Sequence, residues 1–528
     1  MFFVPRVSLD LDETWRQVRS GEVPSAEQCS LISEFLAGAE QDLQEYNAEA
    51  LRLQAFIDAV TAKANQLERL MQMKQSLLAP VRKLPDELLA LIFERCSFDL
   101  FEEKEPAVVY VCSRWRNIAL STPALWSHLV LKPHAGRKYY GPRAQRALDL
   151  HLERSKFCPL TIEVSLRSQD IFHYSGPHSK LYSGPFQLLN VLARYSHRWK
   201  RFELVLDPDL KNEQRKLLTD YFSAIHDLSL LKSFAYKSAL LPDVRTISTI
   251  FKLAVNLESL CLPCLPPDAE TFFPGTNITC LELSVCYSAE VFKLVGKCPR
   301  LQSLTYILDS CDGRVLPGLV PQKSATVQSL EIILARRSKE VFPAIIDSLD
   351  FPSLDSLKVS LSTQVLPIMK TGYYREQAWP SEHFNEFLLR SGCKLKSFSL
   401  SEIHISDIEL CQLLQSDAFS HLGNLAISSL YEGVDSPIST AFLKRLSSDA
   451  LIPRLTKLSL VAKVSLFDDE AFAEAVLSRC PARVPADKPG YLRSVFLLMK
   501  GRVFDPLVYR RLRDGAGSLD LQIVDASR

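Results

Sequence analysis

The chain has 528 residues, of which 47% are hydrophobic, so it is long enough for several domains or one repeat array and too apolar to be wholly disordered. Lysine and arginine total 62 against 61 aspartates and glutamates, a net charge of +1. With so small a net charge, the chain as a whole has no positive electrostatic field that would attract DNA, RNA or anionic lipid. We therefore expect no nucleic-acid partner.

The cysteines and the apolar segments predict an intracellular location. Thirteen cysteines are spread singly along the chain, which is typical of buried free thiols in a reducing compartment. The first ten residues lack the basic flank and apolar core of a signal peptide. No window approaches the ~18 apolar residues that span a bilayer. We expect a soluble cytoplasmic or nuclear protein with no membrane contact.

The first predicted element is a long helix with a heptad pattern. Its two interleaved apolar series are Leu36, Leu43, Ala50, Ile57, Ala64, Met71 and Leu78, and Ala39, Tyr46, Leu53, Val60, Leu67 and Lys74. No proline interrupts the stretch between Pro24 and Pro80, so one helix of about eleven turns is expected. The pattern allows self-association through residues 36–78, as a homodimeric or antiparallel coiled coil, or a helical hairpin packed on its own chain.

Pro80 ends that helix, and two short amphipathic helices follow. The first starts at Leu84, with Pro85 in the first helical position and the acidic Asp86 and Glu87 at the positive end of the helix dipole. The second has one apolar face, formed by Val108, Val111, Cys112, Trp115, Ile118 and Ala119. Two helices this short cannot bury all of this apolar surface against each other. Some of it must be covered by a groove of a partner protein or by the next domain of the chain.

The same stretch carries a motif in three consecutive parts: Leu84-Pro85-x-Glu87-Leu88-Leu89 with Ile92-Phe93, then Val111-Cys112-Ser113-Arg114-Trp115-Arg116, then Pro123-Ala124-Leu125-Trp126. It resembles an F-box, and the whole sequence is similar to the F-box protein family of mushroom-forming fungi. In that family the box docks on the Skp adaptor of a cullin-RING ubiquitin ligase. The resemblance implies these adaptor-binding residues: Leu84, Pro85, Leu88, Leu89, Ile92, Phe93, Val111 and Trp115.

Beyond residue 150 an apolar-x-x-apolar-x-apolar signature recurs. It starts at Trp199, Leu231, Leu257, Ile278, Leu301, Val327, Leu354, Leu395, Leu422, Leu455 and Leu492. Seven copies place a serine just before the second apolar position, namely Ser233, Ser259, Ser303, Ser329, Ser356, Ser397 and Ser494. Successive starts from Leu231 to Leu354 are 26, 21, 23, 26 and 27 residues apart, a spacing typical of leucine-rich repeats.

These patterns predict an α/β chain whose repeats form a solenoid with a parallel concave sheet. The expected order is an N-terminal tail (1–25), a coiled-coil helix (26–79), an α-helical F-box (80–131), a linker (132–157) and an irregular leucine-rich-repeat solenoid (158–528). The outward strand positions are expected to bind a target protein, among them Glu258, Cys261, Glu282, Gln302, Thr305, Glu331 and Lys358.

Catalytic and metal-binding patterns are scarce. Cys261-Leu-Pro-Cys264 has the spacing of a zinc or redox pair, but no second pair lies near it, so we expect no metal. The chain lacks Gly-x-x-x-x-Gly-Lys, Gly-x-Gly-x-x-Gly and Gly-x-Ser-x-Gly motifs. We therefore expect no cofactor and no enzymatic activity.

The sequence favours a substrate-recognition subunit of an SCF-type ubiquitin ligase. Such a subunit acts by proximity, since it holds a target lysine near an activated thioester made elsewhere, and so needs no catalytic residues of its own. The alternative is a non-ligase interaction scaffold, in which the heptad helix dimerises, the repeats bind proteins and the box helices cap the repeat array. The target protein is not encoded in any motif.

Overall fold

The computed structural model describes residues 5–7, 11–95, 107–131, 142–166, 184–206, 218, 220–237, 244–262, 271–284, 290–308, 322–334, 341–362, 379–430, 436–448, 451–462, 467–480, 491–500 and 505–525. The chain divides into two compact units, Met1–Leu89 and Ala90–Arg528. None of the described helices combines the length and the apolar character needed to cross a bilayer.

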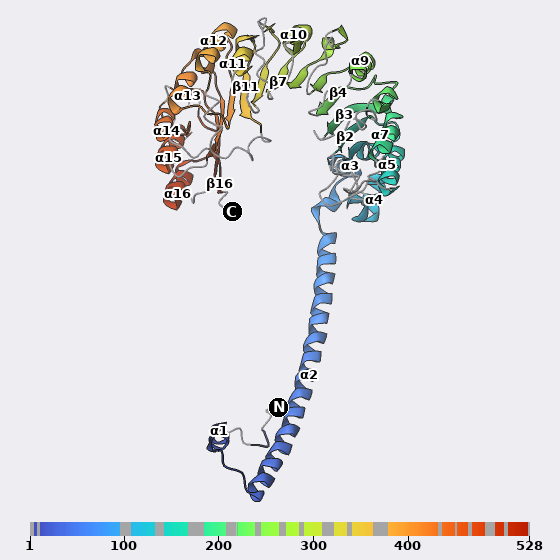
Figure 1. Cartoon of the computed structure of the whole chain (residues 1–528), viewed down its shortest axis with the longest axis vertical. Coiled ribbons are helices and arrows are strands. Elements are labelled where there is room, and N and C mark those ends of the chain that lie inside the picture. The colour runs from blue at the N-terminus through green and yellow to red at the C-terminus, as the bar shows by residue number, and fades with distance from the viewer. Residues whose placement is uncertain are drawn as a thin grey trace, which may run out of the picture. The chain divides into compact units, whose positions relative to one another are not determined.

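The first unit is dominated by one uninterrupted helix, α2 (Ala26–Leu77), which confirms the long N-terminal helix predicted from the heptads (Figure 1). Ser25 caps its start: the Ser25 side chain accepts from the Gln28 amide, and the Gln28 side chain accepts from the Ser25 amide. Two short helices flank it, α1 (Leu11–Ser20) and the 3₁₀ turn η1 (Pro80–Lys83). The proline at position 80 cannot continue the α-helix, so α2 ends before it.

The second unit begins with short helices around the box motif. Helix α3 (Asp86–Glu94) extends across the boundary between the units, with acidic residues in its first turn as expected. The single helix expected from Val108 onward is instead a 3₁₀ turn, η3 (Ala107–Tyr110), followed by α4 (Ser113–Ser121) and a further turn, η4 (Pro123–Trp126). Extended backbone at Cys112 separates η3 from α4.

The rest of the second unit is a parallel sheet of 14 strands whose spatial order equals their order in the chain. The strands are β1 (His128–Leu131), β2 (Leu160–Leu166), β3 (Trp199–Leu206), β4 (Ser233–Lys237), β5 (Ser259–Leu262), β6 (Cys280–Ser284), β7 (Ser303–Leu308), β9 (Ser329–Leu334), β11 (Ser356–Leu361), β12 (Ser397–Ser401), β13 (Asn424–Ser429), β14 (Lys457–Ala462), β15 (Ser494–Met499) and β16 (Asp520–Asp525). A separate parallel pair joins β8 (Gln322–Lys323) to β10 (Leu349–Asp350).

Helices lie between most successive strands and cover one face of the sheet, on the outer side of its arc (Figure 1). They are α5 (Pro142–Arg154), α7 (Gly184–Ala193), α9 (Val244–Leu253), α10 (Glu290–Lys297), α11 (Val341–Asp347), α12 (Ser381–Ser391), α13 (Asp407–Leu414), α14 (Thr440–Leu446), α15 (Asp469–Leu477) and α16 (Pro506–Gly515). Three further 3₁₀ turns are η5 (Ser196–Arg198), η7 (Gly275–Asn277) and η9 (Asp417–Phe419). The other face of the sheet, called the open face below, carries no described helix.

The repeat signature determines where the strands lie. From Leu231 to Leu492 each signature residue is buried, and a strand begins two residues after it. Side chains then alternate between the core and the open face, as at Leu304, Tyr306 and Leu308, which are fully buried. Because each strand buries only one face, one continuous apolar core runs between the sheet and its helices.

Two parts of the chain differ from the sequence expectation. The range 132–157, expected as a linker, contains α5, whose Leu148 and Leu152 are buried in the core. Strands β1 and β16 extend the sheet at its two ends, before the first and after the last signature. The sequence between Ser168 and Pro185, with its histidines, tyrosines and two Ser-Gly-Pro triplets, predicts an exposed loop insertion, and this range falls almost entirely outside the described residues.

Three arginines, two of them buried and Arg390 exposed, join neighbouring helices. Arg198 donates to the Cys158 carbonyl and to the Ser155 hydroxyl just after α5. Arg390 of α12 donates to the carbonyls of Ile346 and Leu349 around the end of α11. Arg479, after α15, does the same at the end of α14. Helix C-termini leave carbonyls without intrahelical donors, so each arginine satisfies groups that burial would otherwise leave unpaired.

Gly275 in η7 allows a close backbone contact with the end of α10. A β-carbon there would overlap the Lys297 carbonyl oxygen and lie 3.1 Å from a Phe273 ring carbon. We expect Gly275→Ala to lower the free energy of unfolding by about 1–3 kcal/mol, as overpacking does elsewhere. Gly296→Ala is the matched control, because its nearest neighbour is a Gln322 side-chain atom at 3.6 Å and alanine favours the helix. Urea unfolding of both variants measures the difference, and equal midpoints would contradict it.

Candidate protein-interaction surfaces

The box helices pack around an aromatic centre. The rings of Phe93 on α3 and Trp115 on α4 lie 4.9 Å apart between centroids. Trp126 of η4 is fully buried, and its indole N–H donates to the Ala119 carbonyl at 2.8 Å. A buried Trp N–H needs such an acceptor, so this bond fixes η4 against the end of α4.

The eight residues proposed for adaptor binding divide by exposure. Leu89 and Phe93 are buried, at 0% and 1%, so they support the helices from inside and present no surface. Leu88, Ile92 and Val111 are 47%, 49% and 58% exposed. Of the remaining three, Pro85 is exposed while Leu84 and Trp115 are half-buried.

Three exposed apolar residues in this region were not singled out from the sequence. Leu91 is 56% exposed on α3, Tyr110 is 63% exposed at the end of η3, and Leu120 is 40% exposed on α4. The spacing of Leu88, Leu91 and Ile92 is that of one helix face, so Leu91 follows from the helical period alone. Exposed neighbouring apolar side chains on short helices are typical of a docking surface for another protein.

The open face of the sheet is a second candidate surface. The seven signature serines stand in one row across the strands, for example Ser303 beside Ser329 and Ser329 beside Ser356. The next row contains five of the predicted target-binding positions on consecutive strands: Cys261, Glu282, Thr305, Glu331 and Lys358. Glu258 and Gln302 lie just before their strands and are exposed.

The chemistry of the open face changes along the sheet. Ion pairs join neighbouring strands within the first nine, Lys237 of β4 to Glu203 of β3 at 3.2 Å and Lys358 of β11 to Glu331 of β9 at 2.7 Å. On the last three strands the same face carries apolar residues in adjacent register positions: Val461, Phe496, Leu498 and Val524. The face therefore offers a partner both charged and apolar contacts.

Five of the described cysteines are buried, and one of them, Cys261, lies on the open face. Burial, together with the neighbouring Glu282 carboxylate, raises the pKa of the Cys261 thiol far above its usual range. Burial likewise raises the pKa of Cys298 to about 12 and that of Cys393 to about 11. The nine described cysteines are free, and these three hold their protons at neutral pH, which makes them poor nucleophiles and poor metal ligands. Cys264 lies outside the described residues.

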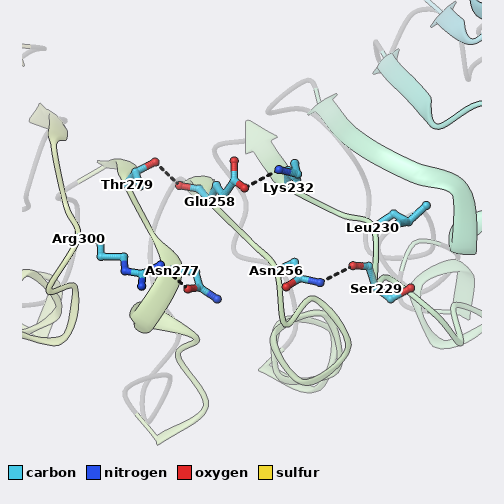
Figure 2. Close-up of a pocket in the computed structure, with 8 residues that line it drawn as sticks. All are labelled: Ser229, Leu230, Lys232, Asn256, Glu258, Asn277, Thr279 and Arg300. Atoms are coloured by element: carbon cyan, nitrogen blue, oxygen red, sulfur yellow. Dashed lines mark hydrogen bonds and ion pairs between the residues drawn. The ribbon is translucent and has the colours of Figure 1, made fainter.

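An open polar hollow of about 470 Å³ lies at the N-terminal edge of β4–β7 (Figure 2). Its side chains bind one another or the backbone across successive strands. Lys232 contacts Glu258 at 2.7 Å, Asn256 donates to the Ser229 carbonyl at 2.9 Å, and Arg300 donates to the Asn277 side chain at 3.3 Å. We interpret these bonds as structural contacts that hold together the segments preceding consecutive strands. No three His, Cys, Asp or Glu side chains of the described residues gather as metal ligands.

Comparisons with known proteins add no family to this geometry. A scan against protein-family models found no match to the chain, and a search of curated proteins found no similar sequence.

Proposed function

We propose that the chain is the substrate-recognition subunit of an SCF-type ubiquitin ligase, in which the box helices dock on the Skp adaptor. The observation that carries the proposal is the exposed apolar surface of α3 and α4 over a fixed aromatic centre. Such helices bind a partner by laying their apolar faces into its groove. The adaptor contact involves Leu84, Pro85, Leu88, Ile92, Val111 and Trp115, while Leu89 and Phe93 hold the helices in place.

The sheet supplies the second half of the proposal. We propose that it is an irregular leucine-rich-repeat solenoid whose open face binds the target protein. Strand order equal to chain order, helices on one face and a strand after each repeat signature all support this assignment. The protein then acts by holding its target near the ubiquitin-loading machinery and performs no bond chemistry itself.

Adaptor binding tests the proposal. We expect the full chain to bind a purified fungal Skp adaptor in a pull-down or by calorimetry. Leu88→Asp with Ile92→Asp is expected to weaken that binding at least tenfold, because each substitution places a charge in an apolar contact. Leu389→Asp is the matched control, since Leu389 on α12 is 82% exposed and lies outside the box.

The result that contradicts the proposal is equally definite. If the wild-type chain is folded by circular dichroism and binds the adaptor no better than the double variant, the box has no adaptor function. The chain is then the non-ligase scaffold, whose N-terminal helix and open sheet face bind other proteins. The observation that favours this alternative is the mostly exposed apolar surface formed by the two heptad series of α2, called the seam below.

A further inference from the structure

Helix α2 carries two adjacent apolar columns and a third, mixed column beside them, and most of the large apolar side chains in these columns are exposed. In heptad notation the two series of the seam are positions a and d, with Leu36 at a. Leu36, Leu53, Ile57 and Leu67 of the seam are between 48% and 60% exposed. The column just before each a position, called the g column, reads Phe35, Asp42, Glu49, Phe56, Lys63, Leu70 and Leu77.

The opposite flank of the seam is polar. The column just after each d position, called the e column, reads Glu40, Asn47, Gln54, Thr61, Glu68 and Gln75. In the g column Phe35, Phe56, Leu70 and Leu77 are between 43% and 66% exposed. The two flanks of α2 therefore differ in chemistry, and a partner helix must match both.

The N-terminal segment of the first unit occupies little of this surface. Arg6 donates from its backbone N–H to the Asp42 carboxylate at 2.7 Å and from its guanidinium to Glu45 at 2.7 Å. These contacts neutralise the one buried acid of the g column. Ala39 and Tyr46 nearby are half-buried, whereas the large side chains of the seam from Leu53 to Met71 are exposed, and a helix this long depends on packing of its apolar face.

We propose that α2 binds a second copy of this chain in the antiparallel orientation, with the twofold axis near residue 55. The pairing rules of two-helix coiled coils indicate which helix fits the seam of α2 and in which orientation. In a parallel pair each g position packs against an e position of the partner, whereas in an antiparallel pair g packs against g and e against e. Four of the seven g residues are apolar and the e column is polar, and only the antiparallel pair places each column against its own kind.

The parallel alternative places unlike groups together. Phe35 would face the partner's Glu40, Phe56 the partner's Thr61 and Leu70 the partner's Gln75. In the seam of a parallel pair, the alanines at 39, 50 and 64 would each face the same alanine of the second copy, which would leave the interface underpacked. Lys74 would also face Lys74 of the partner subunit, a like-charge contact inside the seam.

The antiparallel register centred near residue 55 removes these conflicts. Each seam alanine then faces a larger side chain: Ala39 faces the partner's Met71, Ala50 the partner's Val60, and Ala64 the partner's Tyr46. Pairing large with small fills the layers of a seam evenly.

Most g positions also fit in this register, and the exception is Asp42, which faces the partner's Leu70 and is neutralised by Arg6 of its own chain. Phe35 faces the partner's Leu77, Phe56 meets its own copy at the axis, and Glu49 faces the partner's Lys63. The Glu49 carboxylate already accepts from Arg52 of its own helix at 2.6 Å, and it has lone pairs left for a second donor. The e columns bring Glu40 near the partner's Glu68, one like-charge contact at an exposed edge, where screening makes its cost small.

Zero-length cross-linking of the native chain tests orientation directly. Copies labelled with ¹⁴N and ¹⁵N are mixed, treated with a carbodiimide and digested, so that mass spectrometry identifies links between copies. We expect a Glu49–Lys63 link, because these residues lie about 20 Å apart along one helix and can meet only between copies. A Lys63–Glu68 link between copies instead of it would overturn the antiparallel proposal, as would a monomer in sedimentation equilibrium at tens of micromolar.

Variants test the same contact in the full chain. Phe56→Asp is expected to raise the dimer dissociation constant at least tenfold, because it brings two carboxylates together at the axis. Ala55→Asp is the matched control, since position 55 points away from the seam. Glu49→Lys and Lys63→Glu are each expected to weaken the dimer, and the double exchange to restore it. Circular dichroism checks that each variant keeps the helicity of the wild type. If the double exchange does not restore the dimer, the proposed register is wrong. Neither test depends on adaptor binding.

Discussion

Replacing Arg479 by methionine is expected to lower the free energy of unfolding by about 3 kcal/mol or more. The guanidinium is 2% exposed and donates to four backbone carbonyls, those of Leu446, Ser448, Leu451 and Ile452. Leaving a buried acceptor without a donor costs about 1–3 kcal/mol, so even two unsatisfied carbonyls account for this loss. The methionine fills much of the volume, which leaves hydrogen bonding as the main difference.

Lysine is not expected to rescue this site. One ammonium group cannot reproduce the planar fork that reaches carbonyls on both sides of the loop after α14. Arg454→Met is the matched control, because Arg454 is exposed. Urea unfolding of the three variants and hydrogen exchange of the α14 amides measure the effect. A loss below 1 kcal/mol for Arg479→Met would mean that water satisfies these carbonyls.

A second large effect is expected from His151, which makes stability depend on pH. His151 lies 5% exposed on α5, with its ring 4.9 Å from the Trp126 ring and with Nδ1 unpaired among the described residues. Burial lowers the pKa of His151 to about 4, against the opposing hydrogen bond with the Trp126 backbone and with a contribution from Arg154.

The direction follows from proton linkage. Between pH 6.5 and pH 4 the unfolded chain binds a proton at His151 that the folded chain does not, so stability falls as the pH is lowered. The stabilisation is complete above pH 6.5, and about 3 kcal/mol of it is lost on reaching pH 4.

Two histidine variants isolate this contribution. His151→Leu is expected to flatten the pH dependence of the urea midpoint between pH 7 and pH 4.5. His226→Leu should leave that dependence unchanged, because His226 is exposed. Parallel curves for the wild type and His151→Leu would show that the histidine is protonated inside the fold.

The two proposals concern different parts of the chain and combine without sharing a residue. Adaptor docking uses the box helices, and self-association uses the seam and g column of α2. A dimer would carry two adaptor-binding surfaces and two open sheet faces. Linked sites bind a target with repeated recognition elements more tightly than one site does, because the second contact becomes intramolecular.

Local periodicity in the sequence determined the elements. The heptads predict α2, and the repeat signature predicts each strand from β4 to β15 two residues after its first apolar position. Both patterns depend only on near neighbours in the chain, since the periods of helices and strands are fixed by backbone geometry. The serine row also follows from the sequence once the strands are parallel and in register.

The tertiary structure alone decided which apolar residues remain at the surface. Leu88 and Leu89 are identical in type and adjacent, yet one is 47% exposed and the other fully buried. Phe93, one turn further along α3, is buried against Trp115, which is more than 20 residues away in the chain. Contacts between distant segments likewise decide that Arg479 caps the end of α14 and that His151 is buried. Such contacts join segments that no local period relates, because they arise when distant turns of chain stack against each other.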